Sequence, residues 1–181
     1  MRTLVLDAAE ELFYARGIQS VGMDAIRDSS GVALKRLYQL FPSKEQLVEA
    51  YLERRDVRWR ARLAEYVERC SEPRQRILAV FDWLSAWFSE PGFRGCAWIN
   101  GYGELGSTSQ VVATQARRHK QAFRRYLHDL AAAAGLPESA TEHLYLLAEG
   151  AIVTAGIFTT AEPASSARSA AQELLAALKP A

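Results

Sequence analysis

Apolar residues recur every three or four positions along most of the chain, the spacing that places them on one face of a helix. No segment alternates apolar and polar residues like a half-buried strand, and glycine and proline residues interrupt the helical pattern. The chain is therefore predicted to be all-α. The expected helices cover about residues 3–16, 23–30, 33–41, 44–70, 73–88, 109–134, 138–160 and 163–178, with a short broken helix inside 93–106.

The helix expected over residues 33–41 follows a glycine turn. Gly31 comes directly after the helix over 23–30, and a glycine there supplies the positive φ of a tight turn between helices. Val32 is expected to fill the gap between the two helices. The inner face of the second helix carries Leu34, Leu37 and Phe41. Its outer face carries Lys35, Arg36, Tyr38 and Gln39.

Charge distinguishes this segment from the rest of the chain. Residues 31–44 contain Lys35, Arg36 and Lys44 but no acidic residue, although the formal net charge of the whole chain is only +1. A local excess of cations attracts phosphate groups. Taken alone, a short basic helix after a glycine turn is still more often a solvated helix pair than a DNA reader.

A wider pattern of aromatic, glycine and lysine positions extends over residues 3–52: Phe13, Gly17, Met23, Ile26, Gly31, Val32, Tyr38, Phe41, Lys44, Glu45 and Leu47. This pattern resembles the N-terminal domain of TetR-type transcriptional regulators. The resemblance implies a three-helix DNA-binding domain with a helix-turn-helix over residues 1–47. It also implies that a long helix joins this domain to a helical bundle, residues 48–181, that binds an effector and dimerises.

The resemblance also implies roles for individual residues. In the family, the helix that corresponds to residues 33–41 enters the major groove of DNA. Tyr38 and Lys44 would then contact phosphates and position the protein. The residues expected to read bases are Leu34, Lys35, Arg36 and Gln39.

Two helix starts depart from the family pattern. Ala33 and Gly22 stand where many members have a serine or threonine cap, so a side-chain phosphate contact is expected to be missing at each place. The chain starts at Met1, which leaves little of the basic arm that many members lay in the minor groove, so recognition of a flanking A·T tract is not expected.

The last two helices are candidates for a dimer interface. Small and apolar residues form a stripe that permits close helix approach, and two copies would build a four-helix bundle. The alternative is a core inside one chain, and spacing alone does not separate the two. The TetR resemblance implies a homodimer, whose interface residues would be Leu147, Ala151, Ile152, Ala155, Ala171, Leu174, Leu175 and Leu178.

The middle of the chain is rich in large rings, which together with a few polar groups are the usual makeup of a small-molecule site. Such rings are also common in protein cores, so both readings stay open. For Glu149, structural pairing and effector contact are the alternatives, because a buried carboxylate needs a partner in either case. The expected effector-binding residues are Trp83, Trp87, Trp98, Asn100, Tyr102, Glu104, Phe123 and Glu149.

Several classes of protein are not supported. No Gly-x-Ser-x-Gly elbow or glycine-rich phosphate loop is present, and no histidine has a glutamate three residues before it, so an enzyme is not expected.

Two cysteines make neither a disulfide framework nor a metal site, and for Cys96 burial and redox sensing are the alternatives. No metal or cofactor is expected. The start of the chain has no apolar run of signal-peptide length, and residues 144–161 are too short and polar to span a membrane, which indicates a cytoplasmic protein without a membrane partner.

The sequence therefore predicts a ligand-responsive transcriptional regulator. The expected form is a homodimeric repressor that leaves an inverted-repeat operator in double-stranded DNA when a small apolar or amphipathic effector binds. The alternatives are an architectural DNA-binding dimer without an effector and a small helical-bundle enzyme. Neither the effector nor the operator sequence can be read from the residues.

Overall fold

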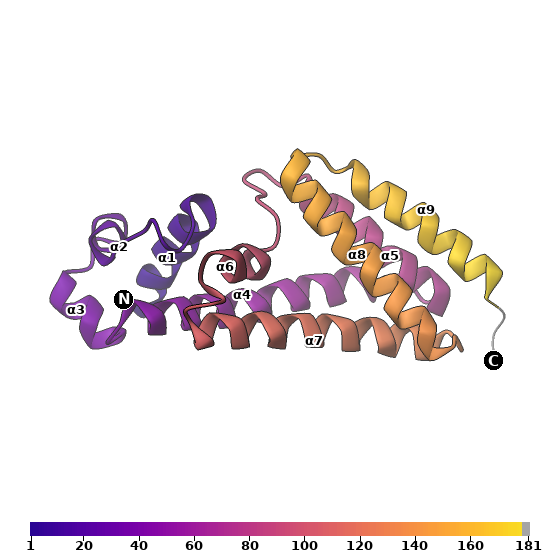
Figure 1. The fold of residues 1–181 in the computed structure, drawn as a ribbon, viewed down its shortest axis with the longest axis horizontal. Coiled ribbons are helices and arrows are strands. Elements are labelled where there is room, and N and C mark those ends of the chain that lie inside the picture. The colour runs from indigo at the N-terminus through magenta and orange to yellow at the C-terminus, as the bar shows by residue number, and fades with distance from the viewer. Residues whose placement is uncertain (179–181) are drawn as a thin grey trace. The chain divides into compact units, whose positions relative to one another are not determined.

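The computed structural model describes residues 1–178 of the chain. These residues form nine helices and no strand, so the all-α prediction is confirmed (Figure 1). The helices are α1 Arg2–Arg16, α2 Met23–Ser30, α3 Leu34–Leu40, α4 Lys44–Val67, α5 Pro73–Phe88, α6 Ala97–Leu105, α7 Gln110–Ala133, α8 Glu138–Phe158 and α9 Glu162–Ala177.

Most helix boundaries lie within one or two residues of the prediction, and α4 and α6 differ more. α4 ends at Val67 rather than near residue 70, because the backbone tightens there into i to i+3 hydrogen bonds from Arg69 to Tyr66 and from Cys70 to Val67. The short broken helix expected inside 93–106 is the continuous helix α6, which begins after a loop with positive φ at Gly92 and Gly95.

Packing divides the described residues into two compact units. Unit 1 combines Met1–Arg58 with Ala97–His119, and unit 2 combines Trp59–Cys96 with the chain from Lys120 onward. The division therefore falls inside α4 and inside α7. The boundary expected between residues 47 and 48 separates a DNA-binding part from an effector-binding part by function rather than by packing, and it stays a prediction.

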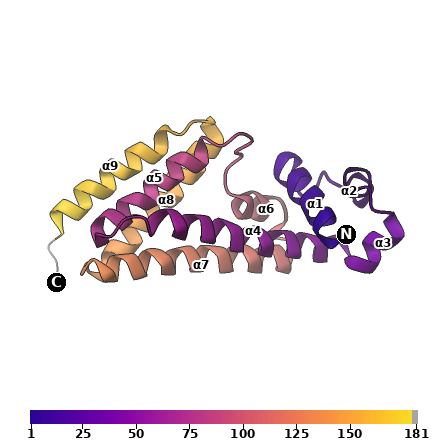
Figure 2. The same ribbon diagram turned by 180° about the vertical axis from the view of Figure 1, so that it is seen from behind.

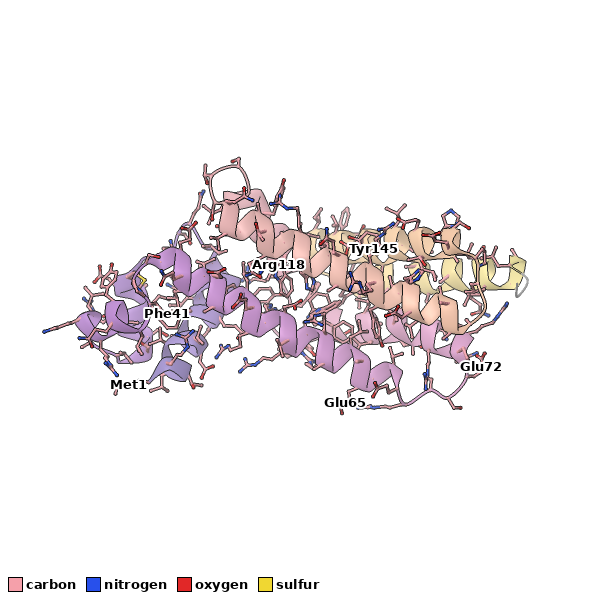
Figure 3. The ribbon with its side chains drawn as sticks, turned by 90° about the horizontal axis from the view of Figure 1, so that it is seen from below. Met1, Phe41, Glu65, Glu72, Arg118 and Tyr145 are labelled. Atoms are coloured by element: carbon pink, nitrogen blue, oxygen red, sulfur yellow. The ribbon has the colours of Figure 1, made fainter. Side chains whose placement is uncertain are left out.

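Unit 1 is built on the apolar faces of its first helices. Ile26, Leu37 and Leu47 are fully buried. Phe41, which directly follows α3 and is labelled in Figure 3, is also fully buried. α4 begins with a side-chain cap, since the Ser43 hydroxyl accepts a hydrogen bond of 3.1 Å from the backbone N–H of Gln46.

Ion pairs hold α1 against α4 in the same unit. Arg54 contacts Asp7 and Glu10 at 2.7 Å each and donates a further bond of 2.7 Å to the carbonyl of Leu6. Arg55 and Arg58 also reach Glu10, at 3.0 and 3.1 Å. Because Arg54 and Glu10 are mostly buried, these pairs fix the first helix more firmly than exposed ion pairs would.

Unit 2 contains α5, α8 and α9, which lie side by side (Figure 2). In this unit α4 ends at Val67, and a short connection leads to α5 at Pro73. Glu65, near the end of α4, and Glu72, just before α5, are labelled in Figure 3. Glu72 caps α5 by accepting hydrogen bonds from the backbone N–H groups of Arg74 and Gln75. Arg74 in turn donates to the carbonyls of Leu175 and Leu178 at 2.7 and 3.0 Å, which ties the end of α9 to the start of α5.

In the part of the chain that the structure describes, no helix has the length and hydropathy that a membrane span requires.

Candidate functional site

The turn between α2 and α3 has the expected geometry. Gly31 adopts φ 67° and ψ 10°, and its N–H donates to the carbonyl of Arg27 at 2.9 Å. Val32 is buried behind it, and its N–H donates to the Ser30 hydroxyl at 3.3 Å. The positive φ predicted for Gly31 is confirmed. A side chain at this position would be strained, because L residues rarely adopt this conformation.

The side chains of α3 divide between an inner and an outer face. Leu37 is buried and Leu34 is half-buried, whereas Lys35, Arg36 and Gln39 are exposed. The Arg36 guanidinium donates a hydrogen bond of 3.0 Å to the Gln39 side-chain oxygen. The ring of Tyr38 also lies in solvent, with 45% of its surface exposed. α3 therefore presents one basic and polar face with no acidic side chain.

The starts of α2 and α3 match the expectation from the sequence. Gly22 and Ala33 occupy the N-cap positions, and neither helix has a side-chain hydrogen bond there. No hydroxyl at either cap is therefore available for a phosphate.

The side chain of Lys44, the first residue of α4, makes contacts within the protein that the sequence did not indicate. Its ammonium donates to the backbone carbonyl of Gln19 at 3.5 Å and lies 6.0 Å from the centre of the Phe13 ring. Burial lowers the pKa of Lys44, and the nearby carboxylate of Glu104 acts in the opposite direction. The link from Lys44 to Gln19 and Glu104 has no signal in the sequence, because Glu104 is far away along the chain.

The candidate effector residues fall into the two units. Trp98, Asn100, Tyr102 and Glu104 lie on α6 in unit 1, where Trp98 is buried and stacks on His119 with ring centres 3.5 Å apart. Asn100 and Tyr102 are exposed. The other four predicted residues belong to unit 2: Trp83, Trp87, Phe123 and Glu149.

The rings of unit 2 form one buried cluster around a residue that the sequence analysis missed. Trp83 and Trp87 stack at 5.6 Å, with 21° between their planes. Trp59 meets Trp83, Trp87 and Phe123 edge to face at 5.0, 5.6 and 5.2 Å. Trp59 is not among the effector-binding residues expected from the sequence, because helical spacing within one segment does not reveal which rings of other helices a side chain contacts.

Glu149 on α8 is paired. Lys120 on α7 donates to its Oε2 at 2.5 Å, and 21% and 16% of the two side chains are exposed. The second oxygen, Oε1, is buried and has no hydrogen-bond partner. Tyr145 lies one turn earlier on the same helix, and burial followed by the charge of Glu149 raises its pKa to about 12. The structural pair expected for Glu149 is thus present, and effector contact through Oε1 stays a prediction.

Comparison with known proteins decides the family. Residues 5–51 match the family described as "Bacterial regulatory proteins, tetR family". An uncharacterised HTH-type transcriptional regulator of Mycobacterium tuberculosis is 31% identical over 124 residues, which cover 62% of this chain and 57% of that protein. The regulator LmrA of Bacillus subtilis is 37% identical over 90 residues, 49% of this chain and 47% of that protein. The chain thus spans about half the length of these curated relatives.

Solved structures extend the likeness over nearly the whole chain. SCO4454, a TetR-family transcriptional regulator from Streptomyces coelicolor, superposes with a TM-score of 0.89 at 29% identity and covers 96% of this chain and 93% of its own. The chain belongs to the TetR family. The reduced form of NemR from Escherichia coli has a TM-score of 0.84 over 99% of this chain and 98% of its own, but at 23% identity it shows the shared fold alone. The relatives named here are described as regulators of transcription and not as enzymes.

In this TetR-family chain, most of the predicted dimer residues pack inside the protomer. Ala151, Ile152, Ala155, Ala171 and Leu175 are buried within unit 2, and Leu147, Leu174 and Leu178 are half-buried. Side chains already buried in one chain have little surface left to bury against a second. A single chain does not test the interface, so its assignment stays a prediction.

The large apolar side chains that α8 leaves exposed were missed. They are Leu146, Val153, Ile157 and Phe158, and Ile157 has 71% of its surface exposed. Between α8 and α9 lies an open groove of about 620 Å³, whose lining includes Leu147, Ala151 and Phe158. The sequence did not reveal this face, because a helix that is apolar all round gives no signal of which side meets its own core.

Both cysteines of the TetR-family chain are free thiols; Cys96 is buried and Cys70 is half-buried. Within residues 1–178 no cluster of three or more histidine, cysteine, aspartate or glutamate side chains could hold a metal ion.

Proposed function

We propose that the protein is a homodimeric transcriptional regulator that binds an inverted-repeat operator and responds to a small-molecule effector. The observation that carries the proposal is the helix-turn-helix itself, in which the Gly31 turn holds α3 with a basic, acid-free outer face. This segment lies within the part of the chain that matches the TetR family. The operator and the effector would be the partners, and no cofactor is required.

The proposed DNA contacts follow from exposure and chemistry. Lys35, Arg36 and Gln39 reach solvent from α3, and Leu34 lies at the start of the same helix, so these four residues would face base edges in the major groove. Arg36 would exchange its bond to Gln39 for a guanine, to which a guanidinium can donate two bonds. Tyr38 and Lys44 would hold phosphates on either side.

The proposed dimer uses the exposed apolar face of α8. Leu146, Val153 and Ile157 follow one another at helical spacing, and a second copy related by a twofold axis would cover the same face of both chains. A twofold dimer matches an inverted repeat, because its two α3 helices would enter successive major grooves about 34 Å apart. The predicted residues Leu147, Leu174 and Leu178 would lie at the edge of this face.

The proposed effector contacts lie in unit 2. Trp83, Trp87 and Phe123 supply apolar rings, and the free oxygen of Glu149 can accept a hydrogen bond. These groups fit an apolar or amphipathic compound that carries one donor. The effector contacts expected for the α6 residues stay predictions: Trp98, Asn100, Tyr102 and Glu104. Because α4 follows α3 directly and contributes residues to both units, it gives a change in unit 2 a covalent route to the DNA-binding helices.

Two experiments test the proposal. Selection from random duplexes followed by anisotropy titration should yield an inverted repeat whose affinity falls steeply with salt. A thermal-shift screen of small apolar and amphipathic compounds should then find ligands that stabilise the protein, and these ligands should weaken operator binding if the protein is a repressor. Operator binding without any stabilising ligand would favour an architectural protein. A cytoplasmic location belongs to the same proposal, because the operator is reached only there.

A further inference from the structure

Glu104 makes a two-way contact with the turn between α1 and α2. Its carboxylate Oε2 accepts a hydrogen bond of 2.8 Å from the backbone N–H of Gln19, and its backbone carbonyl accepts another of 2.8 Å from the Gln19 side chain. The two residues are 85 positions apart in the sequence and lie in the same unit. A carboxylate bound to a backbone N–H is among the stronger hydrogen bonds of proteins.

The α1–α2 turn leaves room for this carboxylate. Gly17 has φ 87°, and a Cβ at that position would lie 3.0 Å from Oε1 and 3.1 Å from Oε2 of Glu104. Any residue other than glycine would therefore push the carboxylate away and also strain the backbone. Gly17 thus allows the close approach of Glu104.

The backbone carbonyl of Gln19 is bound by Lys44. The Lys44 ammonium donates to the Gln19 carbonyl at 3.5 Å, and its pKa is sensitive to the charge of Glu104. A further hydrogen bond reaches the residue after Lys44: the Ser109 hydroxyl donates to the Glu45 carboxylate at 2.8 Å. Residues of α6 and of the segment that leads to α7 therefore hold both the α1–α2 turn and the first residues of α4.

We infer that Glu104 is a positioning residue for DNA binding: it holds Gln19 and, through Gln19, fixes the α1–α2 turn and the Lys44 ammonium. The inference rests on the proposed function, in which Lys44 binds a phosphate. A carboxylate beside a phosphate-binding lysine repels DNA by its charge, so its contribution to binding comes from the hydrogen bond to Gln19. Charge and hydrogen bonding can be separated by substitution.

Glu104→Gln keeps a carbonyl oxygen for the Gln19 N–H but removes the charge, whereas Glu104→Ala removes both. Glu11, an exposed carboxylate on α1, supplies matched controls as Glu11→Gln and Glu11→Ala. Operator affinity should fall about tenfold in Glu104→Ala, the size expected for one lost charge-assisted hydrogen bond. In Glu104→Gln and in both controls it should stay within about twofold of the parent protein.

Amide hydrogen exchange at Gln19 supplies a readout independent of DNA. Exchange should accelerate in Glu104→Ala and stay slow in Glu104→Gln, while the amides of Ile26 and Leu47 in the buried core keep their protection in both variants. Thermal unfolding of each variant separates this local loosening from loss of the fold.

Three outcomes would overturn the inference: unchanged exchange at Gln19 in Glu104→Ala, unchanged operator affinity in that variant despite faster exchange, and equal losses of affinity in Glu104→Gln and Glu104→Ala. Failure of the parent protein to bind any selected duplex would instead refute the proposed function. In that case the exchange measurement still decides whether Glu104 holds the turn.

Discussion

Lys120 on α7 donates a hydrogen bond of 2.5 Å to the carboxylate of Glu149 on α8, and both side chains are mostly removed from water. A mostly buried charge without its partner destabilises the folded protein, because the charge loses hydration and gains no ion pair in return. The pair therefore links two helices of unit 2 and accounts for the single charged residue of an otherwise apolar stretch.

Removing one charge of this pair should destabilise the protein. Glu149→Gln leaves the Lys120 ammonium without its counter-charge, and we expect a loss of about 1 to 3 kcal/mol in the free energy of unfolding, measured by urea denaturation. Adding Lys120→Met to the same chain should recover most of that loss, because the unpaired charge is then gone. Glu173→Gln, an exposed position on α9, is the control. Equal stability of Glu149→Gln and this control would show that the pair contributes nothing.

Two tyrosines should make unit 2 sensitive to alkali. Burial is the first cause that raises the pKa of Tyr126 and of Tyr145 to about 12. In the unfolded chain a tyrosine ionises near pH 10, so above that pH the unfolded state loses protons that the folded state keeps. The contribution of these two tyrosines to stability should therefore be fully present below about pH 10 and be lost from about pH 10 to 12.

Tyrosine-to-phenylalanine variants test this alkaline transition. Tyr126→Phe and Tyr145→Phe should each make the decrease smaller, as followed by urea denaturation at fixed pH values. A pH profile identical to that of the parent protein in both variants would assign the alkaline loss to other groups.

Substitutions in the DNA-binding helices should separate phosphate contacts from base contacts. Lys44→Ala should weaken binding to all duplexes alike and reduce the slope of log affinity against log salt by about one unit for each protomer of the dimer. Arg36→Ala should relax the preference at one operator position. The measurement is anisotropy with the selected operator and single-base variants of it. Loss of base preference in Lys44→Ala, with none in Arg36→Ala, would reverse these roles.

Charges on α8 and α9 should distinguish the dimer face from the protomer core. Ile157 is exposed and Leu175 is 4% exposed, so Ile157→Glu should dissociate the dimer into folded protomers, whereas Leu175→Glu should unfold the protomer. Light scattering and circular dichroism report the two effects. Ser169→Glu on the exposed side of α9 is the control. An intact dimer of Ile157→Glu would place the interface elsewhere.

Local features were predictable from the sequence, and contacts between distant segments were not. The Gly31 turn follows from the backbone, since only glycine adopts a positive φ at little cost, and Leu37 and Phe41 are buried as their spacing requires. Glu104 and Lys44 both contact Gln19, which is far from each of them in the chain. The sequence around Glu104 or Lys44 therefore does not indicate this contact. For α8, the spacing predicted the helix, but apolar residues on all of its sides did not indicate which side would be exposed, so the exposed Ile157 was not predicted.

The most direct test of the account is the salt dependence of binding to the selected inverted repeat. We expect a protein dimer to bind one duplex with a log affinity that decreases linearly with log salt, because two α3 helices and their flanking residues release counterions from several phosphates. Shuffling one half-site should cost most of the specific affinity. Binding that is independent of salt, or equal for the intact and the shuffled repeat, would contradict the assignment of this protein as an operator-binding regulator.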